Sequence, residues 1–363
     1  MLDERWLTNH GPYVAELEST LADMIGVRNV VATCNGTLAL ELAIRALGLH
    51  GEVIVPSFTF VATAHALRWS GIRPVFCDID PLTHTIDASH AERLITPRTT
   101  GILGVHVWGA ASDVAGLEAV AGERNLALVF DAAHALACTH QGRSIGGFGN
   151  AEVFSFHATK VANAFEGGAI ATDDDGLAER LRLLGNFGFS DEDRVVTLGT
   201  NAKMTEAAAC MGLTSLESLD AFVEHNRRNF LLYDEMLRDV PGVRLMRPRE
   251  GERSNFHYVV LEVTDVAGLR RDELHKVLRA ERVLARRYFY PGCHRLEPYC
   301  SDPAGSAPLP VTERVCEQVL CLPTGTSVDP DDVAIVCGLI QEALDHAGEV
   351  RARLVDLDGN PRA

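Results

Sequence analysis

The chain has 363 residues, of which 47% are apolar and 23% charged, so it is long enough for two or three domains with a large buried core. Its net charge of −17 argues against nonspecific binding to DNA or to an anionic membrane, because both depend on a basic surface. No apolar run approaches the ~18 residues that span a bilayer, and the N-terminus lacks the pattern of a secretory signal, so we expect a cytoplasmic protein.

Lysine and cysteine usage narrows the chemistry that the chain can perform. Only three of the 33 basic residues are lysines, namely Lys160, Lys203 and Lys276, so a reaction that needs a primary amine has three candidates. The nine cysteines include no CxxC pair, and the 14 histidines show no HExxH or clustered spacing. We therefore predict no metal site and no disulfide framework.

Strand-like and helix-like segments alternate through the first half of the chain. We expect strands at 53–60, 74–80, 101–108, 126–133, 151–158 and 167–172. Apolar residues at helical spacing indicate helices at 37–49, 113–125 and 177–187. This alternation predicts an α/β domain with a largely parallel sheet, and such sheets bind ligands at the carboxyl ends of their strands.

The pattern changes in the second half. We expect a long helix from about 205 to 240, then a strand at 256–263 and helices at 271–283 and 329–349. We interpret residues 1–240 as a large domain, residues 241–350 as a smaller α+β domain, and residues 351–363 as a frayed or disordered tail.

Lys160 follows an apolar strand and precedes two glycines, in the run FSFHATKVANAFEGGAI. Pyridoxal 5′-phosphate (PLP) chemistry needs an amine that forms an imine with the cofactor and then moves protons, which arginine cannot do. On residue type alone, the alternative of a solvated surface lysine is favoured.

Two further candidates for a PLP site follow the strand LALVF. Asp131 would be costly to bury unpaired, so it is expected either to bond the pyridine nitrogen of PLP or to cap a helix. His134 either contacts the ring oxygen of the cofactor or fills the core.

A helix that begins near Gly36 and Thr37 offers free N–H groups and a positive dipole end, which suit a phosphate. Ser155, five residues before Lys160, offers a hydroxyl to the same phosphate. Phe60, at a strand end, could stack on the cofactor ring. An ordinary capped helix and a core phenylalanine are the alternatives.

Together these residues resemble the DegT/DnrJ/EryC1/StrS family of sugar aminotransferases, from about Trp6 to Thr326. The resemblance is carried by the segments SFTFVATAHAL, PVFCDIDP, FDAAHALA, FSFHATK, EGGAI, GTNAKMTEAAACMGL and YFYPGCHRLEPY. It implies fold type I of the PLP-dependent transferases, like aspartate aminotransferase, with a large, mainly parallel sheet domain and a small C-terminal α+β domain.

The resemblance also implies roles for single residues. Lys160 would be the Schiff-base lysine and Asp131 the pyridine partner, with His134 beside the ring and Phe60 stacked on it. Gly36, Thr37 and Ser155 would hold the phosphate. Members of the family are homodimers with shared active sites, and Asn201 and Lys203 lie in the segment where the partner chain reaches in.

The version of the family pattern found here looks most like enzymes that transfer an amino group from L-glutamate to C4 of dTDP-4-keto-6-deoxy-D-glucose (EC 2.6.1.33), releasing 2-oxoglutarate. Such products are precursors of aminated deoxysugars in natural products, antibiotics among them. The diphosphate of the substrate requires cations near the site, and the candidates are Arg286 and Arg287, beside Tyr288 and Tyr290, together with Arg228 on the long helix. Surface charge is the alternative for each arginine. Thr8 and Asn9 are assigned to the sugar by resemblance.

Other functions remain open on the sequence. A C3 keto-sugar aminotransferase would share every catalytic residue. Family members that dehydrate the sugar have a histidine in place of Lys160, which disfavours that reaction, and a cysteine desulfurase would have to use Cys293. A PLP-binding regulator without turnover would keep the site residues.

Overall fold

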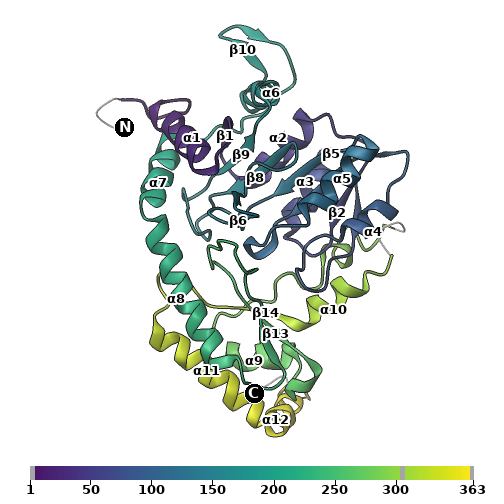
Figure 1. The fold of residues 1–363 in the computed structure, drawn as a ribbon, viewed down its shortest axis with the longest axis vertical. Helices are drawn as coiled ribbons and strands as arrows, with labels where there is room; N and C mark the ends of the chain where they lie inside the picture. The colour runs from purple at the N-terminus through teal and green to yellow at the C-terminus, as the bar shows by residue number, and fades with distance from the viewer. Residues whose placement is uncertain (1–4, 303–306, 360–363) are drawn as a thin grey trace.

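A seven-stranded sheet lies at the centre of the first half of the chain (Figure 1), in the strand order β1-β9-β8-β5-β4-β2-β3. The computed structural model describes residues 5–302 and 307–359. The strands are β1 (Asn29–Thr33), β2 (Glu52–Pro56), β3 (Arg73–Cys77), β4 (Thr99–Val105), β5 (Ala127–Asp131), β8 (Ala151–Ser155) and β9 (Gly168–Thr172). Neighbouring strands are parallel except at β9, which runs antiparallel to β8 and β1. The prediction of a largely parallel sheet is confirmed.

Helices bury both faces of this sheet. Successive strand residues point to opposite faces, so Val30 joins one core and Val31 the other. One face packs against α1 (Pro12–Ile25), α4 (Ala88–Arg93) and α5 (Val114–Arg124), and the other against α2 (Gly36–Ala46), α3 (Val61–Trp69) and α6 (Asp175–Gly185). Burial on both faces explains the nearly continuous apolar runs of the strands.

Two helices then lead to the second sheet. α7 (Glu206–Glu217) packs against α1, and α8 (Leu219–Leu237) runs away from the large sheet (Figure 1). The single helix predicted from 205 to 240 is wrong, because the two helices are separate and meet at Ser218, where φ is −99° and ψ is 0°.

The second sheet has three antiparallel strands, β12 (Val243–Leu245), β13 (Val259–Val263) and β14 (Val319–Leu322). It shares an apolar core with α8, α9 (Arg271–Ala280) and α11 (Pro330–Asp345), while α10 (Pro310–Gln318) contributes to a cluster that joins the two sheets. In that cluster Val105 and Trp108 come from the first half of the chain, and Val260 and Phe289 from the second. The domain limits at 240 and 350 stay a prediction.

The remaining elements are short or terminal. They are β6 (Thr139–His140), β7 (Arg143–Ser144), β10 (Phe189–Asp191), β11 (Arg194–Val195) and α12 (Ala347–Gly359). The prediction of a frayed tail is wrong up to Gly359, since α12 reaches that residue. The strand predicted at 256–263 begins only at Val259, because the N–H groups of Phe256 and His257 bond to the nearby side chains of Ser254 and Asn255 and not to a neighbouring strand. No helix in the two described ranges is long and apolar enough to cross a membrane.

Candidate active site

Lys160 lies in a tight turn after β8, at the carboxyl edge of the parallel strands. Its backbone N–H donates to the His157 carbonyl at 2.8 Å and closes the turn. The side chain is half-buried, and this burial lowers the pKa of the amine from 10.5 to about 8, although the nearby Asp131 carboxylate acts in the opposite direction. This is not the environment of a fully solvated surface lysine.

Asp131 is the last residue of β5, and its carboxylate is buried. Oδ1 accepts a hydrogen bond from the Ala133 N–H at 3.0 Å, and Oδ2 accepts one from the Thr63 hydroxyl at 2.9 Å. Burial raises the pKa of Asp131. The helix-cap alternative is wrong, because turns and no helix follow this residue.

The surroundings of Asp131 fit a cationic ligand group. Both of its hydrogen-bond donors are neutral, and in the described part of the chain it forms no ion pair. A buried carboxylate without a cation is costly, and a protonated ring nitrogen of a ligand would relieve that cost.

His134 is buried in a cluster of aromatic rings. Its Nδ1 accepts a hydrogen bond from the Trp108 backbone N–H at 3.3 Å, so the neutral ring carries its proton on Nε2. The ring stacks on Trp108 and Phe289, each at 6.0 Å, and lies 4.3 Å from Tyr258. Burial lowers the pKa of His134 well below its ordinary value, so the ring is neutral.

The start of α2 meets β8 and β9 at a corner formed by Asn35, Gly36, Thr37, Ser155 and Gly168, which we name the α2 corner. The Asn35 side chain caps the Leu38 N–H at 2.9 Å, whereas the first N–H groups of an α-helix, here those of Gly36 and Thr37, have no partner inside the helix.

Contacts across the α2 corner are close. A Cβ added at Gly36 would lie 3.1 Å from the Ser155 Cβ, and one added at Gly168 would lie 2.6 Å from the Asn35 carbonyl carbon. Glycines at these two positions therefore let the helix start approach Ser155, and the N–H groups and hydroxyl gathered there suit an anion.

A cleft at the end of β2 brings Phe60, from the first half of the chain, together with candidates from the second half. Phe60, 56% exposed, lines this cleft, which we name the Phe60 cleft. Its other lining residues include His275, Arg279, Arg286, Arg287, Tyr288 and Tyr290. Arg286 donates to the Tyr288 hydroxyl at 2.8 Å, and the Arg287 guanidinium lies 4.9 Å from the Tyr290 ring centroid. His275 and Arg279, both on α9, lie outside the sequence prediction.

The remaining candidates lie elsewhere in the chain. The Thr8 carbonyl accepts from the Glu206 N–H at 2.9 Å, and Asn9 pairs with Thr205, so this segment packs on the start of α7. Lys203 pairs with Thr33, directly before the α2 corner, and Asn201 pairs with Asn186. Arg228 is exposed on α8. Thr8, Asn9, Asn201, Lys203 and Arg228 do not line the Phe60 cleft of the same chain.

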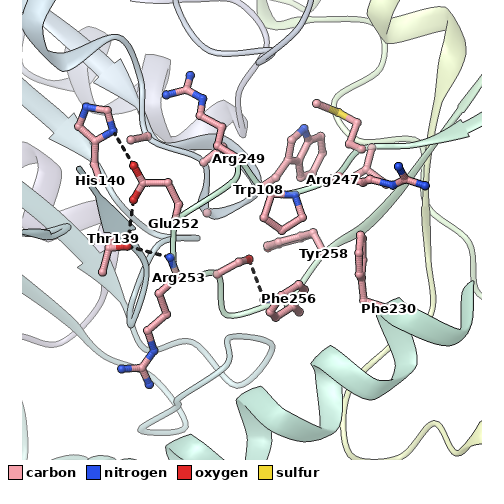
Figure 2. A pocket seen from close by; sticks show the side chains of 17 residues that line it. Trp108, Thr139, His140, Phe230, Arg247, Arg249, Glu252, Arg253, Phe256 and Tyr258 are labelled. Atoms are coloured by element: carbon pink, nitrogen blue, oxygen red, sulfur yellow. Dashed lines mark hydrogen bonds and ion pairs between the residues drawn. The ribbon is translucent and has the colours of Figure 1, made fainter. Parts of the chain in front are cut away.

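Two residues that contact the site, Thr63 and His257, are not predicted from the sequence because their contacts are long-range. Thr63 reaches Asp131 across 68 residues, and the His257 Nε2 lies 2.7 Å from the Thr159 carbonyl across 98 residues. Tyr258, which follows His257 in the chain, packs on His134, as does Trp108. Both residues also line a pocket with Phe256 (Figure 2). In the sequence, His257 stands inside an apolar run that is typical of a strand.

Comparison with known proteins points to one family. Residues 1–341 match the DegT/DnrJ/EryC1/StrS aminotransferase family. The chain is 37% identical to a dTDP-4-amino-4,6-dideoxy-D-glucose transaminase of Shigella dysenteriae, over 92% of this chain and 91% of the relative. It is 34% identical to a GDP-perosamine synthase of Caulobacter vibrioides, over 94% and 93%. The solved structure of DesI in the presence of its TDP-sugar product is similar, with a TM-score of 0.93 and 50% identity over 97% of this chain and 90% of that one.

Proposed function

Because this chain belongs to the DegT/DnrJ/EryC1/StrS aminotransferase family, we propose that it is a PLP-dependent enzyme that transfers an amino group from L-glutamate to C4 of dTDP-4-keto-6-deoxy-D-glucose. The products are dTDP-4-amino-4,6-dideoxy-D-glucose and 2-oxoglutarate. The observation that carries the proposal is the half-buried amine of Lys160, with its low pKa, near a buried carboxylate that forms no ion pair with any described residue. The names of the Shigella transaminase and of the DesI complex support the substrate.

The residues present fit PLP at each of its polar groups. Asp131 would accept a hydrogen bond from the protonated ring nitrogen, and the α2 corner, with Gly36, Thr37 and Ser155, would hold the phosphate. Phe60 would stack on one face of the ring, and His134 would lie beside it as a neutral ring. Bound PLP supplies an aldehyde that takes up the amino group and a ring that withdraws electrons from the carbon that bears it.

Lys160 would bind the cofactor and move protons. An amine with a pKa of about 8 is partly neutral near neutral pH, so it both attacks an aldehyde and exchanges a proton at small cost. Asp131 stays an anion when a cation lies against it, which keeps the charge of the site balanced. The rings of Trp108, Tyr258 and Phe289 pack against His134 and would limit the access of water to the cofactor from that side.

The Phe60 cleft is the site that we propose for the nucleotide sugar. Arg286 and Arg287 would bind the diphosphate, since arginine binds phosphate oxygens through two parallel N–H groups. Tyr288 and Tyr290 hold or stack against these guanidinium groups, which limits the conformational entropy lost on binding.

We also propose that the active protein is a homodimer with shared sites. Large apolar side chains are exposed around the hairpin of β10 and β11, which projects from the large sheet (Figure 1), namely Phe187, Phe189, Val195, Val196 and Leu198. An exposed apolar group of this size is typical of an interface. In a dimer, Thr8, Asn9, Asn201, Lys203 and Arg228 of one chain would complete the Phe60 cleft of the other.

The test is a half-reaction followed by product analysis. PLP-loaded protein should lose its visible absorption with L-glutamate and regain it with dTDP-4-keto-6-deoxy-D-glucose, and NMR should place the nitrogen at C4. Lys160→Ala should abolish both changes, whereas Lys276→Ala, which alters an exposed lysine on α9, should keep them.

Each other outcome rejects a stated part of the proposal. Nitrogen at C3 would overturn the position of transfer, and a preference for a GDP-linked keto sugar, as the name of the Caulobacter relative suggests, would overturn the nucleotide. No turnover with either sugar would favour the regulatory alternative.

A further inference from the structure

A histidine from the second half of the chain holds the turn that carries Lys160. Nε2 of His257 donates to the Thr159 carbonyl at 2.7 Å. Inside the turn, the Lys160 N–H donates to the His157 carbonyl and the Thr159 N–H to His157 Nδ1. From outside the turn, His257 thus holds the peptide unit that directly precedes Lys160.

The tautomer of His257 follows from this contact. A ring that donates through Nε2 and is neutral has an unprotonated Nδ1. This Nδ1 is buried and has no hydrogen-bond partner within residues 5–302 and 307–359. Burial, together with the positive charge of Lys160, lowers the pKa of His257 to about 4, although the hydrogen bond to the Thr159 carbonyl acts in the opposite direction, so the ring stays neutral and the donated hydrogen bond persists at neutral pH.

The segment 255–258 also holds the loop that carries His134. The Asn255 side-chain amide donates to the carbonyls of His134 and Leu136, both at 2.9 Å, and its oxygen accepts from the His257 N–H at 3.0 Å. Tyr258 packs its ring on His134 at 4.3 Å. One short segment therefore holds both the turn that carries Lys160 and the loop that carries His134.

We propose that His257 is a positioning residue for Lys160, holding the Thr159 carbonyl so that the amine stays half-buried near Asp131. The proposal rests on the function proposed for Lys160. The Asp131 carboxylate on β5 raises the pKa of this amine, and the positive charge of the amine in turn lowers the pKa values of His134, in the following loop, and of His257. If the hydrogen bond from His257 to the Thr159 carbonyl is lost, the turn becomes less ordered and water reaches the Lys160 amine. The pKa of this amine then rises toward that of an ordinary lysine.

The experiment measures the Lys160 amine in the full chain freed of cofactor. The variants are His257→Leu, which removes the donor, His257→Gln, which keeps an N–H at the reach of Nε2, and His257→Asn, whose amide is too short. Competitive acetylation over a range of pH values, read by peptide mass spectrometry, reports Lys160, with Lys203 and Lys276 as references in the same sample. His225→Leu is the matched control, because His225 makes the same kind of bond, to the Val328 carbonyl at 2.9 Å.

In His257→Leu and His257→Asn we expect the titration midpoint of Lys160 to rise from about 8 by about one pH unit, with about tenfold less labelling at neutral pH. His257→Gln and His225→Leu should match the wild type. An unchanged midpoint in both the Leu and the Asn variants, or an equal shift in all three variants of His257, would overturn the proposal. If His257→Leu does not fold, the Gln and Asn variants decide.

A second measurement separates this inference from the proposed function. Wild-type protein loaded with PLP is reduced with borohydride, and the modified peptide is identified. PLP on Lys203, or on no lysine, would overturn the function proposed for Lys160. The acetylation result would still decide whether His257 controls this amine.

Discussion

The Thr63 hydroxyl donates to Oδ2 of Asp131 at 2.9 Å and so ties the first turn of α3 to the end of β5. Thr63 in turn contacts the Thr59 hydroxyl at 2.8 Å. Phe60 lies between these two threonines in the chain. The same short segment therefore orients the buried carboxylate and places the aromatic ring that lines the cleft.

Thr63→Val should destabilise the cofactor-free protein. The substitution keeps the shape of the side chain but leaves a buried carboxylate oxygen without one of its donors. We expect the free energy of unfolding to fall by about 1–3 kcal/mol, as measured by urea denaturation. Thr214→Val is the control, since Thr214 is exposed on α7, and it should change that free energy by no more than about 0.5 kcal/mol. Equal losses in the two variants would contradict the role of Thr63.

The rate at which cofactor-free protein takes up PLP should depend on pH through Lys160. Only the neutral amine attacks an aldehyde, so the rate should rise about tenfold per pH unit below the pKa of the amine and level off above about pH 8. Stopped-flow absorbance measures this rate. A rate that keeps rising beyond pH 10, where an ordinary lysine titrates at about 10.4, would contradict the burial of the amine.

Gly168→Ala should weaken PLP binding. The added Cβ would lie 2.6 Å from the Asn35 carbonyl carbon and 2.7 Å from the Gly36 nitrogen, so the α2 corner must move. We expect at least about a tenfold rise in the Kd for PLP, measured by equilibrium dialysis, and a loss of roughly 1–3 kcal/mol in the free energy of unfolding. Gly122→Ala, on α5 with open space around it, should instead stabilise the protein by about 0.5–1 kcal/mol. Unchanged affinity in the Gly168 variant would rule out the α2 corner as the phosphate site.

Arg287→Met should affect the two half-reactions unequally. Loss of a charge-assisted hydrogen bond of about 1.5–3 kcal/mol predicts at least a roughly tenfold rise in KM for the nucleotide sugar. The half-reaction with glutamate, which involves no diphosphate, should change little. Arg124→Met, an exposed arginine on α5, is the control for both rates. Equal effects on both half-reactions would place Arg287 outside the diphosphate site.

The periodic parts of the fold could be predicted from the sequence. Buried strands such as β5 and amphipathic helices such as α2 repeat their apolar residues with a period that local sequence reveals. The division between α7 and α8 at Ser218 was missed because the helical apolar pattern continues across it. Helix α12 was missed because its residues include many charges and, in 347–355, none is buried in a core that would give an apolar pattern.

A residue of the candidate site could be predicted from the sequence only where a single local motif contains its functional group. Lys160 and Asp131 each stand beside a recognisable strand. Thr63 and His257 do not, since each acts on a residue far away in the chain, and nothing in a local pattern records such a contact. Arg228 stays a prediction, because a charge on a long helix can be assigned to a site only when the surface that its face meets is known.

The antiparallel direction of β9 has a consequence for the order in which the protein can fold. β8 pairs with β9 through residues close in sequence, such as Ser155 with Gly168, whereas β1 pairs with β9 through distant residues, such as Asn29 with Thr172. Closing a short loop costs less entropy than closing a long one. The turn that carries Lys160 can therefore form early, while the start of α2, which we propose for the phosphate, joins it only when β1 pairs with β9. Uptake of PLP, which needs both parts of the proposed site, would then show when β1 has paired with β9.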